Sequence, residues 1–532
     1  MRPFHLRLSR FELLAWSLAL ACGVAPLWAG GLPLVDLPQH LHLISVLHRL
    51  SDPTTLFPET FGIRPVVTPY LGVYYCVSLL NWLVPLQTAM RLFLTAYVAG
   101  LPLALAFLLR SLRRPAWPAL LAIPFAYGDS FAWGFLNYCS ALPLTFLSLG
   151  LFVRTLEDPA RRRTWAIAQA VTLCGVLLFH VQAFAYLAAA LPLLLLSTRA
   201  PEDAQRTLPW ASHLWKSRRA ALLSVVPGVA LFAVWVGSRF GEPQEIAYGQ
   251  PWKAWGPMLS PQNLAWHSAQ DNQHNLVPLL GNLLADGADM RAVYLAFGLA
   301  ALGVVAALVL GREALEGRLA RFRIVALCAL ALALYFLLPA DIYGYVYYLN
   351  WRFTHLFAAL AVACVPALEA RGRRALLALA ALVGPVTAWP LARAFAAYEV
   401  EARAVESLAA YAPAKPRVMG LVYRTQSPLV THPVHLHEAA TVARLAGGLT
   451  NFSFATTPHS PLMYRGDAPP TFPSEWHPET MDWETQGRFY DTFVVAGAHP
   501  SQIPALGPHV GRDCEVAGEA GGFYLVRRRA AP

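Results

Sequence analysis

Apolar segments that could cross a lipid bilayer recur through the first three quarters of the chain. A spanning helix needs about 20 mainly apolar residues for a hydrocarbon core of roughly 30 Å. The segments occupy residues 11–34, 88–109, 116–128, 133–153, 165–179, 182–198, 220–237, 291–310, 324–339, 353–369 and 375–391. Several are short, which indicates helices that are broken or shielded by neighbouring protein. The pattern predicts an all-α polytopic membrane domain with about eleven transmembrane helices.

Composition excludes two other classes of protein. Of the 532 residues, 56% are hydrophobic and only 14% are charged, which is too apolar for a soluble globule of this length. The net charge of +10 could indicate nucleic-acid binding. However, the basic residues lie in short clusters between apolar segments, whereas a nucleic-acid-binding protein collects them on one polar face. We therefore expect membrane lipids as partners and no nucleic acid.

The basic clusters predict the orientation, because short cytoplasmic loops carry an excess of Lys and Arg. All the clusters can face the cytoplasm together only if residues 69–85 do not cross the membrane. We expect an interfacial or re-entrant helix there, a cytoplasmic N-terminus on an uncleaved first anchor and an external C-terminus. The Ala, Arg and Leu content favours a bacterial inner membrane. The clusters lie at residues 2–10, 110–114, 154–163, 199–219, 312–323 and 371–374.

Two domains are expected. Residues 1–391 form the membrane domain, with large external loops at 35–87 and 238–290. Residues 392–532 change to mixed charge with many Pro and His residues, which predicts a small extracytoplasmic α/β domain. Its strands are expected at 417–423, 491–496 and 522–527, and a helix at 436–445.

Asp36 and His40 directly follow the first apolar segment. Pro38 can begin a helix there, which brings the carboxylate and the imidazole, four residues apart, close to one face. Polar groups at the mouth of a membrane domain mark functional cavities. Alternatively, Asp36 merely caps the helix.

Asp129 and His180 are further polar residues that lie between apolar segments. Asp129 lies between two apolar segments among glycines and aromatic residues, where it is either a site carboxylate or the N-cap of a helix at Ser130 or Phe131. His180 and Gln182 lie between two apolar segments at their external ends. Each could bind substrate, although a lone His there is also typical of a hydrogen-bonded turn.

The aromatic stretch at residues 339–355 contains further candidates for substrate binding. Arg352 and His355 enter an apolar segment from its external end, against the positive-inside trend. The planar guanidinium of Arg352 suits a phosphate, although a snorkelling anchor is the alternative. Tyr343 and Asn350 lie beside them, where aromatic residues also form ordinary interfacial belts.

The sequence offers no clear ligand set for a divalent metal. His432, His435 and His437 have a loose metal-like spacing, yet no cysteine or carboxylate set completes them. In the loop 238–290, Trp252 and Trp255 with the surrounding amides suit stacking on sugar rings, or ordinary interfacial packing. No cofactor is expected.

The arrangement resembles the GT-C superfamily of membrane glycosyltransferases, which includes protein O-mannosyltransferases and aminoarabinose transferases. The resemblance rests on Asp36 after the first helix, on a long first external loop with a juxtamembrane helix at 69–85, and on Ala89-Met-Arg91-Leu92 at the start of the second long apolar helix. It covers the topology of the membrane part. The chain differs from the commonest family pattern at Leu37, where many members have a second acidic residue, and lacks a clear Pro-Pro-Leu at the juxtamembrane helix.

The resemblance implies an enzyme that uses a polyprenyl-phosphate-linked sugar donor and an extracytoplasmic glycan, lipid or protein acceptor. It implies that Asp36 is the general base and that Asp129 is the second acidic residue. Arg352, together with Arg91 or His355, would hold the departing phosphate. Two alternatives stay open: a transporter or flippase for a lipid or polysaccharide, and a non-catalytic scaffold.

Overall fold

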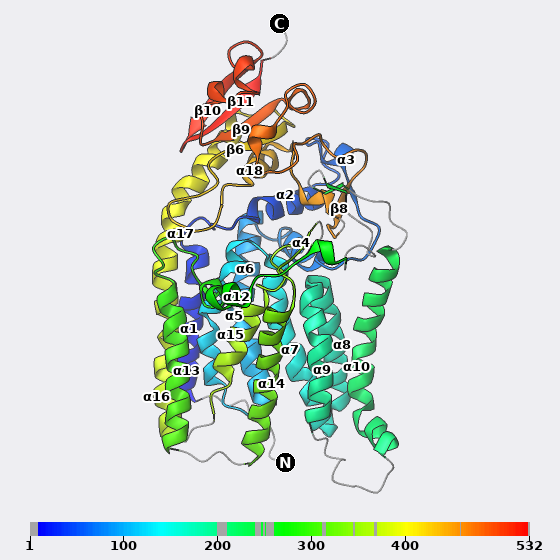
Figure 1. Cartoon of the computed structure of the whole chain (residues 1–532), viewed down its shortest axis with the longest axis vertical. Coiled ribbons are helices and arrows are strands. Elements are labelled where there is room, and N and C mark those ends of the chain that lie inside the picture. Colours follow the sequence, from blue (N-terminus) through cyan, green and yellow to red (C-terminus); the bar gives the residue numbers. More distant parts are fainter. Residues whose placement is uncertain are drawn as a thin grey trace.

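The computed structural model describes residues 9–198, 210–239, 246–247, 250–251, 260–310, 315–343, 346–366, 370–457 and 459–529. A tall bundle of helices carries a small sheet-containing region at one end (Figure 1). The main helices of the bundle are α1 (Arg10–Val24), α5 (Leu86–Ser111), α7 (Leu136–Glu157), α8 (Arg162–Phe179), α9 (Val181–Ser197), α10 (Trp210–Arg239), α13 (Met290–Leu310), α14 (Leu315–Leu337), α15 (Phe353–Ala363), α16 (Ala370–Ala381) and α17 (Val383–Leu408).

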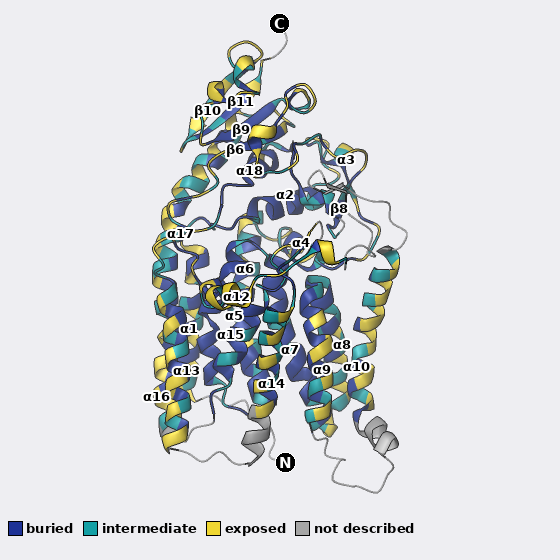
Figure 2. Ribbon diagram, in the orientation of Figure 1, coloured by how far each residue is buried: buried dark blue, intermediate teal, exposed yellow. Residues whose placement is uncertain are grey.

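Six stretches of helix are long and apolar enough to cross a membrane. Apolar side chains such as Leu14, Val171 and Leu308 are exposed on the outside of the bundle, as lipid contact requires (Figure 2). Further apolar helices of the described residues are shorter, and the total of eleven crossings stays a prediction. The chain is a multi-pass membrane protein. The six stretches are Arg10–Trp28, Leu86–Ser111, Leu136–Glu157, Arg218–Ser238, Met290–Val309 and Gly372–Tyr411.

The expectation of an α-helix at 116–128 was wrong. This segment forms two successive 3-10 helices, Trp117–Ala122 and Pro124–Tyr127. Pro118 and Pro124 lack the backbone N–H that an α-helix would need, and each stands at the start of one of these short helices. The residues of both helices are buried, so neighbouring helices shield this irregular backbone as the bilayer requires.

The juxtamembrane helix α4 (Leu71–Leu80) agrees with the expectation for residues 69–85. Its 10 residues are far fewer than the roughly 20 that a crossing requires. A second helix of this end, α2 (Leu37–His48), lies across the top of the bundle beneath the sheet region (Figure 1).

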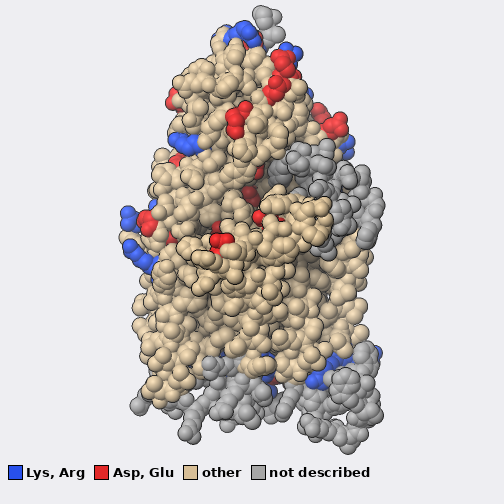
Figure 3. Space-filling view, in the orientation of Figure 1, with Lys and Arg blue, Asp and Glu red and all other residues tan. Residues whose placement is uncertain are grey.

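The basic loops meet at one end of the bundle. Glu157 pairs with Arg113 at 3.4 Å and with Arg323 at 3.0 Å, and the Arg154 guanidinium donates to the carbonyl of Arg110. On the face shown in Figure 3, charged side chains gather at this lower edge and on the upper region, with a broad uncharged band between them. This distribution is what a bilayer imposes, whereas the direction of crossing stays a prediction.

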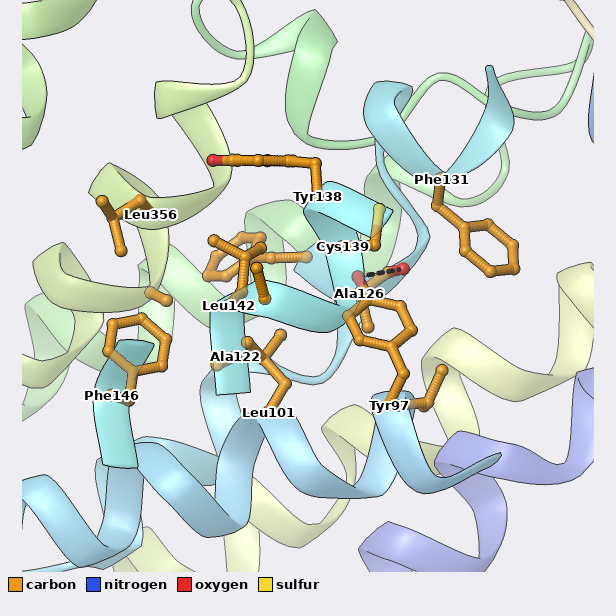
Figure 4. Close-up of a cluster of buried hydrophobic side chains, with 14 of the residues drawn as sticks. Tyr97, Leu101, Ala122, Ala126, Phe131, Tyr138, Cys139, Leu142, Phe146 and Leu356 are labelled. Atoms are coloured by element: carbon orange, nitrogen blue, oxygen red, sulfur yellow. Dashed lines mark hydrogen bonds between the residues drawn. The ribbon is translucent and has the colours of Figure 1, made fainter. Parts of the chain in front are cut away.

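The core of the bundle lies beneath the upper region. Tyr97 on α5, Tyr138 and Cys139 on α7 and Leu356 on α15 pack together there (Figure 4). The hydroxyl of Tyr97 donates to the carbonyl of Ala126 at 3.0 Å, which satisfies two polar groups in an apolar surrounding.

The upper region is built on a five-stranded sheet in the order β10-β11-β9-β6-β7. The predicted strands are confirmed as β6 (Arg417–Val422), β9 (Thr492–Ala496) and β11 (Phe523–Arg528), and the predicted helix as α18 (Glu438–Ala446). The strands β7 (Leu449–Thr450) and β10 (Cys514–Ala520) were not expected. β6 is parallel to β7 and β9, whereas β11 is antiparallel to β9 and β10.

Two connections tie the sheet region to the bundle. Helix α17 runs without interruption from Val383 to Leu408, so it crosses residue 391 and carries the chain from the bundle to the sheet. Strand β1 (Phe61–Ile63), in the first external loop, pairs antiparallel with β8 (Leu462–Tyr464) of the tail. The first loop and the tail therefore form one structure above the bundle.

Candidate functional site

Asp36 is held at the start of α2 by its backbone rather than by its side chain. It occupies the N-cap position, yet its carboxylate accepts no capping hydrogen bond from the described backbone of α2. Its N–H donates to the carbonyl of Trp133 at 3.1 Å. A Cβ at Gly134, where φ is +85°, would lie 2.9 Å from Cβ of Asp36, so only glycine fits there. The capping alternative therefore does not explain this carboxylate, whose side chain is 16% exposed.

His40 anchors α2 instead of contacting Asp36. Its Nε2 lies 3.0 Å from the carbonyl of Gly134, and its Nδ1 lies 2.9 Å from the hydroxyl of Tyr74 on α4. Because a carbonyl only accepts, Nε2 carries the hydrogen and Nδ1 accepts from Tyr74. Burial lowers the pKa of His40, with the charge of Asp36 opposing this effect. His40 is a neutral, oriented support beside the carboxylate.

Asp129 is bound by a histidine of the tail. It is the first residue of α6 (Asp129–Ala132), whose N-cap is Gly128, so the expected cap role is wrong. Its Oδ1 lies 2.9 Å from Nε2 of His432, and both side chains are nearly buried. The ring of Trp133 meets His432 edge-on at 5.5 Å.

His437 of the same tail segment meets Asp36. Its Nε2 lies 3.3 Å from Oδ1 of Asp36, and its Nδ1 lies 3.3 Å from Oε2 of Glu475. The third histidine of the tail, His435, instead pairs with Glu401 of α17 at 2.9 Å. The three histidines thus face different carboxylates, and among the described residues no group of three His, Cys, Asp or Glu side chains could hold a metal ion.

The roles of His432, His437 and Glu475 were missed from the sequence. The spacing of the histidines suggested only a loose metal motif, whereas the structure gives each one its own carboxylate partner. Glu475 carried no local signal at all, because it follows a turn-rich stretch. The pairing Asp36–His437 spans more than three quarters of the chain, so only the folded structure reveals it.

Arg352 lies above the ring of Phe135, six residues after Asp129 in the chain. Its guanidinium carbon is 4.4 Å from the ring centre of Phe135, its Nη1 is 3.4 Å from Nε2 of His180, and its Nη2 donates to the carbonyl of Tyr347. Its Nε makes no hydrogen bond within the described part of the chain. Phe135 directly follows Trp133 and Gly134, which contact Asp36. Arg352 and Asp36 therefore both contact segment 133–135.

Other predicted site residues have structural contacts. Arg91 donates to the carbonyls of Leu27 and Gly30 at 2.6 and 2.7 Å, which fastens the segment after α1. Asn350 is fully buried and bonds Asn272 and the carbonyl of Tyr335.

Four more candidates are His180, Gln182, His355 and Tyr343, of which His180 contacts Arg352. His180 caps α9 by accepting from the N–H of Gln182, which confirms its expected turn role, and it also contacts Arg352. Gln182 donates to the carbonyl of Leu349 at 2.6 Å. His355 is buried, and its Nε2 packs against Gly128, the residue before Asp129. Tyr343 is half exposed at 51%.

The external loop can be followed only in part. Trp252 and Trp255 lie outside the described residues. Of its remaining aromatic residues, Trp266 donates to the carbonyl of Leu337 at 3.2 Å. Next to it, His267 accepts from the indole of Trp351, which stacks on Tyr348 at 4.8 Å.

Segment 129–138 links these groups. It carries Asp129, supplies the carbonyl that binds the backbone of Asp36, and places the ring of Phe135 under Arg352. The result is a partly exposed carboxylate, a second paired carboxylate and a guanidinium around one segment. Such a set can accept a proton from a hydroxyl and hold a negatively charged group.

Comparison with solved structures identifies the fold. The crystal structure of ArnT from Cupriavidus metallidurans bound to undecaprenyl phosphate matches 98% of this chain and 98% of its own, with a TM-score of 0.57 and 12% identity. Arabinofuranosyltransferase AftD from Mycobacteria matches 98% of this chain and 40% of its own, with a TM-score of 0.50 and 14% identity. The chain has the GT-C fold. No protein-family profile and no curated protein sequence matches it.

The GT-C fold confirms the resemblance found in the sequence. The match to ArnT covers both the helical bundle and the region above it that contains Asp36 and His437. At identities this low, the likeness concerns the fold alone. The chemistry has to be argued from the side chains of this chain.

Proposed function

We propose that the chain is an integral membrane glycosyltransferase that moves a sugar from a polyprenyl-phosphate carrier to an extracytoplasmic acceptor. The observation that carries this proposal is the carboxylate of Asp36, which is partly exposed, makes no capping bond to α2 and belongs to a residue held by Trp133, two residues before the ring on which Arg352 lies. The GT-C fold supports it, because a solved protein of this fold binds undecaprenyl phosphate.

In the proposed reaction, Asp36 accepts the proton of an acceptor hydroxyl. The oxygen of that hydroxyl forms a bond to the anomeric carbon of the sugar, and the bond between this carbon and the carrier phosphate breaks. The electron pair of the broken bond leaves with the phosphate, whose charge Arg352 stabilises. One base and one cation suffice, because phosphate is already a good leaving group.

Asp129 has a different proposed role from Asp36. Its carboxylate lies closer to its histidine than the carboxylate of Asp36 does, at 2.9 Å against 3.3 Å, and is less exposed, at 10% against 16%, so it is less available as a base. It lies one turn before Trp133, whose carbonyl holds the backbone of Asp36. We assign Asp129 to positioning the site rather than to accepting the proton of the acceptor.

The proposal includes the location of the protein and the side of the membrane on which each domain lies. Residues 1–391 are the membrane domain and 392–532 an extracytoplasmic domain, in a bacterial inner membrane with the N-terminus in the cytoplasm. The basic end of the bundle, around Glu157, supports this orientation, because basic loops stay in the cytoplasm.

The test is turnover of a defined panel of donors. Purified protein in detergent or nanodiscs is incubated with polyprenyl-phosphate sugars that carry different hexoses and pentoses, with a mixture of glycan, lipid and peptide acceptors. Release of polyprenyl phosphate together with a glycosylated acceptor is the expected result. A flippase would instead bind the carrier without transferring sugar. In vesicles, it would move the carrier from one leaflet to the other.

A further inference from the structure

We propose that His437 and Glu475 of the tail are positioning residues for the Asp36 carboxylate, so that the external domain completes the active site. This inference rests on the proposed glycosyltransferase function and extends it. It assigns a role in the reaction to a part of the chain that lies about 400 residues beyond Asp36.

The geometry places one imidazole between two carboxylates. His437 is only 4% exposed, and its two ring nitrogens lie 3.3 Å from Asp36 and 3.3 Å from Glu475. The ring of Phe454 meets the imidazole edge-on at 6.0 Å and covers it. An ionised carboxylate only accepts hydrogen bonds, so both nitrogens need a hydrogen to contact both carboxylates favourably. The imidazolium form meets that requirement.

The charges around His437 favour the same form. The facing groups are Asp36 and His40 from α2, Glu438 from α18 and Glu475 from the loop before β9. Burial lowers the pKa of His437, but Glu475, Asp36 and Glu438 together outweigh it, so the pKa is raised. Burial raises the pKa of Glu475, and the charge of His437 opposes that effect.

A charged His437 would serve Asp36 in two ways. First, it holds the Oδ1 atom, which leaves the other oxygen free for the acceptor hydroxyl, and α2 itself supplies no such restraint. Second, its positive charge favours the ionised carboxylate, so the base remains available at lower pH. Glu475, whose Oε2 lies 3.3 Å from Nδ1 on the opposite side of the ring, favours the protonated ring through its charge.

The competing explanation is a tie that merely fastens the tail to the bundle. Such a tie would lower stability when removed but would leave the pH dependence of catalysis unchanged. His435 provides a matched control, because it lies two residues away, is equally buried and pairs with Glu401 at 2.9 Å without contacting Asp36. His435→Gln should lower stability and keep the pH profile of the wild type.

The experiment compares wild type, His437→Gln, Glu475→Gln and His435→Gln at a series of pH values. For the wild type, we expect kcat/KM to fall as the pH rises through the pKa of His437, because the imidazolium is lost. Glu475→Gln should move this alkaline limb to lower pH by about one unit. His437→Gln should lower kcat by about 10-fold and abolish the limb.

A second measurement does not depend on transfer. The ring carbons of 13C-labelled histidines are followed by NMR, and the His437 signal is assigned by its loss in His437→Gln. A signal that titrates above the ordinary histidine range, and at lower pH in Glu475→Gln, supports the proposal. A His437 that is neutral where the enzyme is active would overturn it.

The outcomes separate the two proposals. If the wild type transfers sugar while His437→Gln keeps its kcat and pH profile and loses only stability, as His435→Gln does, the positioning role is rejected and the glycosyltransferase stands. If the wild type transfers no sugar from any carrier, both are rejected, and the wild-type assay alone reveals this.

Discussion

His432 and Asp129 are 303 residues apart in the chain, yet Nε2 of the histidine lies 2.9 Å from Oδ1 of the carboxylate. Five residues further on, His437 contacts Asp36. One short segment of the tail thus binds both acidic residues that the sequence had placed at the membrane mouth. The segment is itself fastened to the external loop, where Thr431 donates from its N–H to the carbonyl of Leu283 at 3.0 Å.

The Asp36→Asn variant should fold and bind donor normally but lower turnover by about 100-fold or more, because Asn has the size of Asp without its basicity. Single-turnover transfer and the thermal unfolding midpoint are measured on the same preparations. Asp158→Asn is the control, since Asp158 is a true N-cap that accepts from the N–H of Arg161 at 3.3 Å. Equal turnover by the wild type and Asp36→Asn would rule out the base.

The Arg352→Ala variant should weaken the binding of a polyprenyl phosphate, with Kd raised about 10-fold or more, because the bidentate guanidinium is lost. Arg352→Lys should restore only part of the affinity, since an ammonium group binds phosphate as a point charge. Titration with undecaprenyl phosphate measures Kd directly. Arg374→Ala, at an exposed position of the basic end, serves as the control, and an equal Kd for both alanine variants would exclude the clamp.

The His432→Gln variant should lower the free energy of unfolding by about 1–3 kcal/mol, because the nearly buried carboxylate of Asp129 loses its hydrogen-bond partner. The double variant with Asp129→Asn should recover part of this loss, which a double-mutant cycle quantifies. His477→Gln is the comparison, because its pair with Glu479 is exposed to solvent and should contribute little to stability. Additive effects of the two site variants would show that the pair is not coupled.

Reporter fusions test the orientation. A reporter joined after Arg114 should be active only on the cytoplasmic side, and one joined after Arg512 only on the external side. The reason is that α4 has only 10 residues and leaves the basic cluster 110–114 with the other basic loops. An external Arg114 would overturn the placement of every proposed site residue relative to the membrane.

Local sequence patterns predicted the elements but not the pairings. Hydropathy located the long helices, because an apolar helix must match the thickness of the bilayer. Short apolar runs located β6, β9 and β11. Hydropathy predicted the wrong type of helix at residues 117–127. The composition there resembles that of a membrane-spanning α-helix, but a proline at the start of each short helix favours 3-10 geometry.

In the candidate site too, some residues could be found from the sequence, whereas their contacts could not. Asp36 could be found from its place after the first helix, whereas Arg91 was expected to hold phosphate and instead binds the carbonyls of Leu27 and Gly30. The sequence around an arginine does not reveal whether its guanidinium binds a phosphate or backbone carbonyls. His437 and Glu475 were not predictable, because their partner is set by the packing of α18 over α2 rather than by any neighbour in sequence.

The dependence of Asp36 on residue 437 has a consequence for how such a protein is made. A ribosome delivers the chain from its N-terminus, so Asp36 emerges first, and the membrane helices are complete well before Glu475 is synthesised. The carboxylate, its histidine and the second glutamate can meet only when almost the entire polypeptide exists. On the proposed function, a nascent or truncated chain in the membrane therefore lacks full activity toward the carrier lipids around it, and full activity begins as a late step of biogenesis.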